Sequence, residues 1–370
     1  MSRYRFELAT PADDADLRRI LAETPMGGRI AVGFCREPSY FSSAVVEGDF
    51  HQVIAARDCE SGKAVGFGSR SIRLRYVNGR PEPIGYLGSL RVLKSHRTGG
   101  LVARGYKFLR ELHGDQRTSL YLTTIAAGND AVIRLLTSGR AGLPAYLYAG
   151  DYCTLAIPLA RRRRAVVPSS LTIRPAVADD LATILAFLAA QGPRRQFFPC
   201  YTPQDFFTPH GALRDLRPAD LLLAFRGEQL VGTLGAWDQH GFRQNVVLGY
   251  SGFMGWSRFP YNGWARLRGL PGFPRPGEPF RHLTAALPLA ADDDPAVFAA
   301  LVDAVMSHAA DRDASYLLLG LHATDSLLPI AQTRCATCYT TQLYLVCWDD
   351  GESLAAQLHG RVPYLELGSL

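Results

Sequence analysis

The sequence predicts an α/β fold built from two successive copies of one unit, each a mixed, mostly antiparallel sheet flanked by helices. Three observations predict it: a length of 370 residues suits two domains, segments of the first half recur in the second, and a glycine-containing turn joins a strand to a helix. Hydrophobic residues make up 47% of the chain and charged residues 20%, which excludes a disordered, collagen-like or coiled-coil protein. The net charge of +6 is compatible with an anionic ligand and requires no nucleic-acid partner.

The repeat begins with a short strand followed by a helix. Residues 5–9 and 171–174 are predicted strands, and the helices after them start near Pro11 and Pro175, which stand 164 residues apart. Proline and acidic residues are typical of a helix N-terminus. Leucine and isoleucine recur in both helices at intervals of three and four residues, so each helix is expected to bury one face. These apolar positions are Leu17, Ile20 and Leu21 in the first helix and Leu181, Ile184, Leu185 and Leu188 in the second.

Further strands recur at a growing offset. Val65, in a strand that follows a polar turn, matches Val231, 166 residues later, whereas Ser119 matches Ser315, 196 residues later. The growth of about 30 residues predicts an insertion in the second copy, placed at residues 241–280. The strands that these matches predict are 51–57, 64–76 and 119–125 in the first copy and 220–225, 229–237 and 315–321 in the second.

A basic segment separates the copies. Arg161 to Arg164 precede Pro168, Ser169 and Ser170. Like charges repel, and proline and serine disfavour a regular element, so this segment is predicted to be a linker, with a nucleic-acid or anionic-lipid contact as the alternative. The predicted organisation is residues 1–158 for the first copy, 159–170 for the basic linker, 171–350 for the second copy with its insertion at 241–280, and 351–370 for a C-terminal tail.

The first copy contains a candidate anion site. A strand over residues 82–92 runs into a basic turn with Gly99 and Gly100, and a helix is predicted over residues 101–113. Glycines let the backbone approach a ligand closely, and the free amides and positive dipole end of a helix N-terminus favour phosphate. The turn contains neither the G-x-x-x-x-G-K-S/T pattern of nucleotide-binding P-loops nor the G-x-G-x-x-G pattern of dinucleotide sites.

The order of elements and the run Arg97-Thr98-Gly99-Gly100-Leu101-Val102 resemble the GNAT (GCN5-related N-acetyltransferase) superfamily, here as a tandem two-copy member. Members of that superfamily bind acetyl-CoA at an R/Q-x-x-G-x-G/A turn after the fourth strand. Arg97 and Gly100 match this motif, whereas Val102 replaces its small residue.

The resemblance implies a cofactor, acetyl-CoA or another acyl-CoA, bound by the first copy. It implies that the end of the fourth strand pairs with the pantetheine arm, that the turn holds the pyrophosphate, and that an Asn after the fifth strand lies near the arm. The cofactor-binding residues that it implies are Leu90, Arg91, Val92, Arg97, Thr98, Gly99, Gly100, Leu101, Val102, Ala103 and Asn129.

The resemblance also implies acyl transfer to an amine, carried by a small molecule or a peptide. A Tyr commonly protonates the leaving thiolate in this family, but the register from Asn129 puts Leu136 there, so the acid must come from elsewhere. Tyr146, Tyr148 and Tyr121 are candidate acids, although packing in the core or at an interface is the favoured interpretation of each. Tyr86 and Ser89, on the fourth strand, are candidates for holding a water that acts as base.

The second copy is predicted to have lost cofactor binding. At an offset of 196 residues, the Arg97 turn maps onto Asp293-Asp294-Pro295-Ala296. Carboxylates there repel a pyrophosphate, and a proline removes an amide that would hold it. The second copy is therefore expected to shape the acceptor pocket. His282 and His322 are either acid–base groups facing that pocket or ordinary packed histidines.

The insertion at residues 241–280 combines aromatic residues and arginines with a single acid, Glu278. This composition favours a flap that packs on the other copy or, in a homodimer, on a second subunit, and it also suits an acidic or amphipathic acceptor, a membrane surface or single-stranded nucleic acid. Two other functions stay open: a non-catalytic acyl-CoA-binding or scaffold protein, and an aminoacyl- or lipid-modifying transferase of the same doubled fold.

The remaining features predict an ordinary cytoplasmic enzyme without a metal. Seven cysteines are scattered, and Cys335 and Cys338 lie in a strand-like run without the further ligands of a zinc site. Residues 1–7 lack the apolar stretch of a secretory signal. The longest uncharged run considered as a membrane span, residues 244–257, falls short of the roughly 20 residues that a bilayer span needs.

Overall fold

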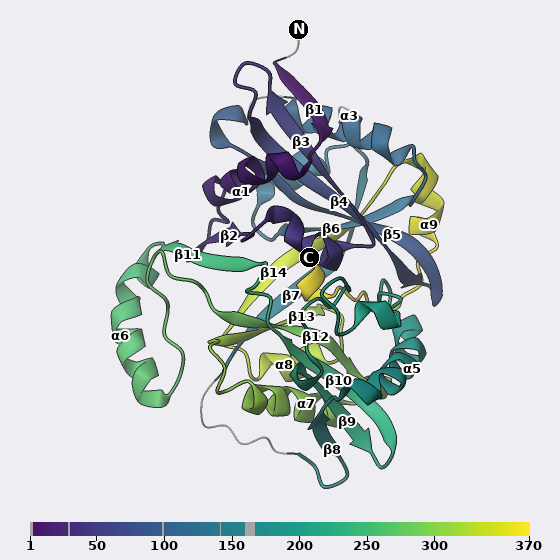
Figure 1. Cartoon of the computed structure of the whole chain (residues 1–370), viewed down its shortest axis with the longest axis vertical. Coiled ribbons are helices and arrows are strands. Elements are labelled where there is room, and N and C mark those ends of the chain that lie inside the picture. Colours follow the sequence, from purple (N-terminus) through teal and green to yellow (C-terminus); the bar gives the residue numbers. More distant parts are fainter. Residues whose placement is uncertain (1–2, 29, 98–99, 141, 160–166) are drawn as a thin grey trace.

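The computed structural model describes residues 3–28, 30–97, 100–140, 142–159 and 167–370 (Figure 1). The linker arginines, Arg161 to Arg164, lie outside the described residues. The first copy forms β1 (Tyr4–Leu8), α1 (Asp14–Glu23), β2 (Ile30–Cys35), α2 (Ala44–Glu47), β3 (Phe50–Asp58), β4 (Ala64–Val77), β5 (Arg80–Val92), α3 (Leu101–His113), β6 (Leu120–Ala126), α4 (Asp130–Leu136) and β7 (Ala145–Pro158). The second copy and the tail form β8 (Thr172–Pro175), α5 (Leu181–Gln191), β9 (Leu221–Arg226), β10 (Gln229–Trp237), β11 (Gln244–Tyr250), α6 (Phe253–Arg268), β12 (His282–Ala290), α7 (Pro295–His308), β13 (Tyr316–His322), α8 (Leu328–Gln332), β14 (Thr337–Cys347) and α9 (Glu352–Ala356).

One 12-stranded sheet runs through both copies, in the order β1-β3-β4-β5-β6-β14-β7-β13-β12-β10-β9-β8. It is mixed and mostly antiparallel, with helices on both faces, which confirms the predicted fold class. The strands of the first copy form the upper part of Figure 1, and those of the second copy form the lower part. Each half of the sheet repeats the other, because the order of the first copy is mirrored in the second.

The last strand of each copy pairs with a strand of the other copy. β7 of the first copy pairs with β13 of the second, and β14 of the second copy pairs with β6 of the first. β7 and β14 also pair with each other along most of their length. The sequence repeat does not predict this exchange, which joins the two copies into a single continuous sheet.

The exchanged strands carry core residues of the opposite copy. Leu155 and Ile157 of β7 are fully buried in the cluster that α7 and β13 form. Leu343 of β14 is buried beside Ile84 and Leu122 of the first copy. Because burying apolar area is the dominant stabilising term in folding, each half depends on the other half for part of its core.

The helices lie where the apolar periodicity places them. Leu17, Ile20 and Leu21 of α1 are buried, as predicted. Val53 and Ile54, neighbours on β3, belong to the core clusters of α1 and α3, respectively. Since successive side chains of a strand point to opposite faces, α1 and α3 cover opposite faces of the sheet. Among the described helices, none is both long and apolar enough to cross a membrane.

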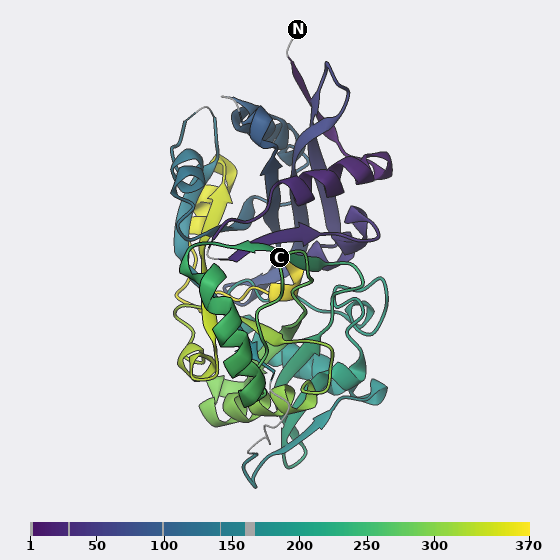
Figure 2. The ribbon, with the colours of Figure 1, turned by 90° about the vertical axis from the view of Figure 1, so that its left-hand side faces the viewer.

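The insertion reaches back to the first copy. β11 pairs with β2 in a separate two-stranded antiparallel sheet. We call residues 244–280, which contain β11 and α6, the arm. Figure 1 and Figure 2 show α6 at the surface, beside the body of the molecule. The strand and the long helix inside this segment are features that the repeat did not predict.

Replacing Gly320 by alanine tests the seam between β7 and β13. Gly320 pairs with Thr154, and a Cβ at Gly320 would overlap the hydroxyl of Tyr152, which is 2% exposed and donates to the Leu365 carbonyl. Because overpacking costs about 1–3 kcal/mol, we expect Gly320→Ala to lower the free energy of unfolding by that amount in urea denaturation followed by circular dichroism. Gly263→Ala in α6 is the control, since nothing lies within 4 Å of a Cβ there. An equal loss in both variants would contradict this account of the seam.

Candidate functional site

The fourth and fifth strands that the first copy contributes to the 12-stranded sheet are β5 and β6, and they separate halfway along their length. β5 and β6 run parallel and pair only at Gly85–Tyr121 and Tyr86–Leu122. Just beyond, Ser89 has a φ of 53°, and the register between β4 and β5 shifts, as in a β-bulge. We call this region, residues 87–92 of β5 and 123–126 of β6, the first splay. A bulge next to separating strands turns backbone groups away from the ladder.

The glycine turn follows the first splay directly. Gly100 is the N-cap residue of α3, and its φ of 89° lies in the left-handed region that favours glycine. Among the described residues, no side chain caps this helix. Arg97 is exposed, and its Nε donates to the Val92 carbonyl at 3.1 Å. The predicted site residues Thr98 and Gly99 lie outside the described residues. The start of α3 thus presents helix amides beside a basic side chain, as an anion site requires.

A cavity of about 330 Å³ lies between α3 and α4. Ala103, a predicted cofactor residue, lines it together with Arg134 and Arg140. The sequence analysis missed these two arginines, although both follow closely on Asn129. The other residues that line the cavity are Ala131, Leu135, Ser138 and Leu143. Two guanidinium groups next to the start of α3 suit a ligand with several phosphates.

The other predicted cofactor residues lie around the same edge. Leu90 is 41% exposed on β5, and Arg91 and Val92 follow it. Asn129 is exposed as the N-cap residue of α4, and its carbonyl accepts from the amides of Val132 and Ile133. The predicted cofactor residues therefore lie along one path, from β5 over the start of α3 to α4. Leu101 is buried and Val102 half-buried in α3.

The structure brings two of the three predicted catalytic residues to the first splay. The Tyr86 hydroxyl lies 2.8 Å from the Thr124 hydroxyl and so bridges β5 and β6, while burial raises the pKa of Tyr86. Ser89 is the bulge residue itself. Tyr148 lies on β7, separated from β6 by β14, and donates to Asp151 at 2.7 Å. That hydrogen bond, with a smaller effect of burial, raises the pKa of Tyr148 to about 12.

The remaining tyrosine candidates and Leu136 serve packing. Leu136 is 4% exposed in the core. Tyr146 shares a hydrogen bond with Tyr106, and Tyr121 bonds Arg70 and His113. Burial raises the pKa of Tyr146 well above its ordinary value.

The second copy has the same bulge, but its amide is occupied. Leu287 on β12 has a φ of 52°, beside a register shift to β10. The Leu287 amide donates to the Glu366 carboxylate at 3.1 Å. The hydroxyl of Tyr364 also donates to Glu366, at 2.7 Å. Within the part of the chain that the structure describes, no side chain accepts a hydrogen bond from the Ser89 amide, so the two bulges differ in a chemically decisive way.

The turn after β12 is also closed to an anion. Asp294 accepts from the amides of Ala296 and Val297 at the start of α7. The three acids of this turn are themselves paired with arginines. The pairs are Asp292 with Arg194, Asp293 with Arg195, and Asp294 with Arg226. The amides that would hold a phosphate are bonded to a carboxylate, which supports the expectation that the second copy binds no CoA.

The two candidate histidines of the second copy are packed inside it. His322 is 3% exposed, with Nε2 2.9 Å from the Ala149 carbonyl, and burial lowers its pKa. His282 stacks on Phe280, and burial lowers its pKa to about 4. Both rings therefore serve the packing of the second copy.

A buried polar cluster, which the sequence analysis missed, lies on the α1 side of the first splay. Its centre is Glu47, whose carboxylate accepts from Ser43 at 3.1 Å and from Arg243 of the insertion at 3.0 Å, and lies 3.0 Å from Nε2 of His51. Burial raises the pKa of Glu47, but the hydrogen bond with His51 and the charges of Arg243 and Arg36 outweigh it and hold the pKa well below its usual range. Glu47 is thus a structural anion.

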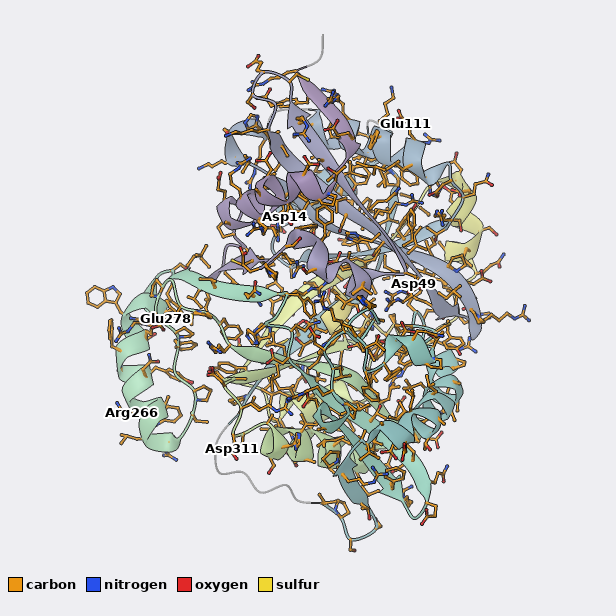
Figure 3. The ribbon with its side chains drawn as sticks, in the orientation of Figure 1. Asp14, Asp49, Glu111, Arg266, Glu278 and Asp311 are labelled. Carbon is orange, nitrogen blue, oxygen red and sulfur yellow. The ribbon has the colours of Figure 1, made fainter. Side chains whose placement is uncertain are left out.

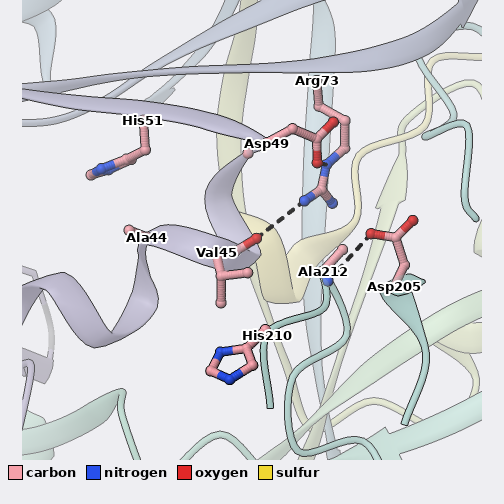
Figure 4. Close-up of a pocket in the computed structure, with 9 residues that line it drawn as sticks. Ala44, Val45, Asp49, His51, Arg73, Asp205, His210 and Ala212 are labelled. Carbon is pink, nitrogen blue, oxygen red and sulfur yellow. Dashed lines mark hydrogen bonds and ion pairs between the residues drawn. The ribbon is translucent and has the colours of Figure 1, made fainter. Parts of the chain in front are cut away.

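A second cavity, of about 340 Å³, lies between the copies (Figure 4). His51 and Arg73 of the first copy line it together with Asp205 and His210 of the second. Arg73 donates to the Val45 carbonyl at 3.2 Å and pairs with Asp49. The second copy therefore contributes one wall of this cavity, and the cavity adjoins the Glu47 cluster through His51.

Comparison with known proteins identifies the fold. No protein-family model matches the chain, and no curated protein matches its sequence significantly. A GCN5-related N-acetyltransferase from Sphaerobacter thermophilus matches with a TM-score of 0.53 and 13% identity, over 100% of this chain and 99% of that one. N-myristoyltransferase from Saccharomyces cerevisiae, solved with bound myristoyl-CoA, matches with a TM-score of 0.60 and 12% identity, over 94% of this chain and 79% of that one.

A third structure extends this likeness. The GCN5-related glucosamine N-acetyltransferase region of a fungal multi-domain β-N-acetylglucosaminidase matches with a TM-score of 0.62 and 14% identity. The match covers 92% of this chain and 38% of that protein. At such identities the likeness is one of fold, and the fold is that of the GCN5-related N-acetyltransferases, which confirms the predicted resemblance at that level.

The Glu366 carboxyl predicts a pH dependence of stability. Burial raises its pKa from 4.5 to about 7. The folded protein therefore keeps this proton to a higher pH than the unfolded chain, so its contribution lowers stability as the pH rises from about 4.5 to 7. At 1.36 kcal/mol per pKa unit, the loss approaches about 3 kcal/mol. Glu366→Gln cannot ionise, so urea denaturation across this window should give a flatter profile. Parallel profiles for the two proteins would contradict the assignment.

Proposed function

We propose that the protein is an acyl-CoA-dependent N-acyltransferase that carries an acyl group, in the simplest case acetyl, from CoA to an amine. The observation that carries the proposal is the contrast between the two bulges. The Leu287 amide of the second copy is bonded to Glu366, whereas the Ser89 amide of the first donates to no side chain among the described residues. This contrast supports the first copy as the one that binds the cofactor.

The residues along the first splay fit an acyl-CoA. Leu90 to Val92 would pair with the pantetheine arm, and the start of α3 at Gly100 would hold the pyrophosphate. Arg134 and Arg140 would bind the outer phosphates from the cavity beside α4. The match to a structure with bound myristoyl-CoA supports this placement of an acyl-CoA.

The chemistry follows from these positions. A bound acyl-CoA supplies an activated thioester carbonyl. The Ser89 amide would donate to the carbonyl oxygen as negative charge develops there, which is the largest single contribution in many acyl transfers. Tyr86 and Ser89 would hold a water that takes the proton of the amine. The second copy would complete the acceptor pocket, since it supplies Asp205 and His210 to the cavity between the copies.

The alternative function is a protein that binds acyl-CoA without turning it over. Leu136 is buried where the family commonly has an acid. The two functions are separated by measuring free thiol release from acetyl-CoA with a panel of amines. Binding without any thiol release would favour the alternative.

Replacing Arg134 by glutamate tests the cofactor site. The carboxylate would repel the phosphates instead of pairing with them, so we expect Arg134→Glu to weaken acetyl-CoA binding at least about tenfold in isothermal titration, and Gly100→Asp to act likewise. Arg110→Glu, the same charge change near the exposed C-terminal end of α3, is the control. Longer acyl-CoAs and free CoA, titrated in parallel, report the preferred chain length. Equal affinities in all variants would place the cofactor elsewhere.

A further inference from the structure

The α1 side of the first splay holds more positive charge than its own groups neutralise. Arg36, Arg91 and Arg243 converge there, and Glu47 is the one carboxylate among the described residues that pairs with any of them. The side chain of Arg36 is 13% exposed and that of Arg243 is 10% exposed. Three guanidinium groups against one carboxylate leave a buried excess of positive charge, which is costly unless an anion compensates it.

Arg91 is the least satisfied of the three. It follows the Ser89 bulge by two residues and lies opposite Phe67 of β4, so it points to the side of the sheet that α1 covers. Its guanidinium stacks over the Phe34 ring at 5.4 Å, and its buried Nε has no hydrogen-bond partner. No hydrogen bond or ion pair of the Arg91 side chain is found among the described residues. Burial and the neighbouring charge of Arg36 lower its pKa.

Arg36 adds a second unsatisfied group. Its one carboxylate contact in the described chain is Glu47, at 3.7 Å, and its Nε is buried without a partner. Tyr40, 1% exposed, lies close enough to Ser89, Arg36 and Glu47 for these groups to shift its pKa. The donors therefore gather beside the bulge where the thioester carbonyl would lie, which is where an acceptor must bind.

We propose that the amine acceptor carries a carboxylate, which Arg91 and Arg36 bind on the α1 side of the first splay, so that the acceptor class is amino acids. This inference rests on the proposed acyltransferase function. In the reaction the amine nitrogen bonds to the acyl carbon, the carbon–sulfur bond breaks, and the thiolate leaves while the amine loses a proton. The carboxylate stays unchanged and serves only to hold the amine in place.

Matched acceptor pairs test this class with the full-length protein. Each amino acid is compared with its carboxamide by free thiol release from acetyl-CoA. The amide has the less basic amine, so intrinsic reactivity near neutral pH favours the amide and works against the expected result. We expect kcat/KM to be at least about tenfold higher for the acid, as one charge-assisted pair supplies. Phosphoethanolamine distinguishes a carboxylate from a phosphate as the bound anion.

Two variants locate the anion site. Arg36→Met should raise KM for the amino acid about tenfold and leave the amide unchanged, while Arg110→Met on α3 leaves both unchanged. Arg91→Met should lower kcat/KM for the amino acid more than for the amide. Arg36→Met should keep its affinity for acetyl-CoA, which separates this site from the cofactor site. Equal use of acid and amide, or a preference for phosphoethanolamine, would overturn the inference and leave the acyltransferase intact.

A binding readout covers the case without turnover. N-acetyl amino acids should stabilise the CoA-bound protein in a thermal shift measurement more than their amides do. Equal shifts would overturn the amino-acid class. Loss of acetyl-CoA binding itself would instead overturn the proposed function.

The arm carries an independent signal. On α6, Trp256, Leu267 and Phe259 are 84%, 88% and 70% exposed, and Trp264 is 48% exposed. Positions 256, 260, 263 and 267 share one helix face by their spacing. The opposite side is held, because Tyr261 packs on Phe273 with ring centroids 4.6 Å apart and Ala265 is fully buried.

Besides its exposed aromatic residues, α6 carries a net positive charge. Its 16 residues include Arg258, Arg266 and Arg268 and no acid. Figure 3 shows Arg266 and Glu278 on the arm, away from the two halves of the sheet. An exposed apolar face flanked by arginines is the pattern of a helix that lies in the interface of an anionic membrane. The geometry points to an anionic lipid surface as the partner of α6.

Vesicle sedimentation tests this surface. The full chain should bind vesicles that contain phosphatidylglycerol and not pure phosphatidylcholine vesicles, and Trp256→Ser with Leu267→Ser should lower the bound fraction at least about fivefold. Leu8→Ser, at a leucine of β1 that is 40% exposed, is the matched control. Equal binding to neutral vesicles would overturn the membrane assignment. It would also be overturned if the protein bound no vesicles and instead formed a dimer in sedimentation equilibrium that the double variant dissociates.

Discussion

The exchange of β7 and β14 is the constraint on which the rest of the structure depends. Each strand pairs with a strand of the opposite copy and with the other exchanged strand, so the centre of the sheet belongs to both copies. The C-terminus lies near the middle of the molecule (Figure 1), and close to it Tyr152 of β7 donates to the Leu365 carbonyl. Glu366 follows Leu365 directly, and its carboxylate accepts from the Leu287 amide at the bulge of the second copy.

Duplication followed by divergence explains why the bulges look alike and behave differently. A left-handed residue at Ser89 and at Leu287 keeps the same backbone geometry in both copies. The difference lies in the side chain that accepts from the amide, because Glu366 accepts from Leu287 and, among the described residues, no side chain accepts from Ser89. The two copies therefore share the backbone geometry of the bulge while the side chain that meets its amide differs.

Local patterns were enough to predict the mixed fold, the repeated helices and the glycine turn. Leu17, Ile20 and Leu21 are buried as their spacing predicts, since amphipathic periodicity reports which face meets a core. The exchange could not be predicted in this way, because β7 and β14 have similar apolar patterns. Pairing with a strand of either copy would bury their apolar side chains. The arginine cluster was missed for the same reason. Arg36 and Arg243 are far apart in sequence and meet near Glu47 only because β11 pairs with β2.

The insertion contains both the arginine that lies beside the first splay, Arg243, and the exposed helix α6, a connection that its composition did not predict. Arg243 directly precedes β11, bonds Glu47 beside the first splay, and is followed by α6 in the arm. The pairing of β11 with β2 fixes β11 against the first copy, next to Arg36, which also pairs with Glu47. A partner bound to α6 would therefore contact a segment whose first strand is anchored beside the first splay.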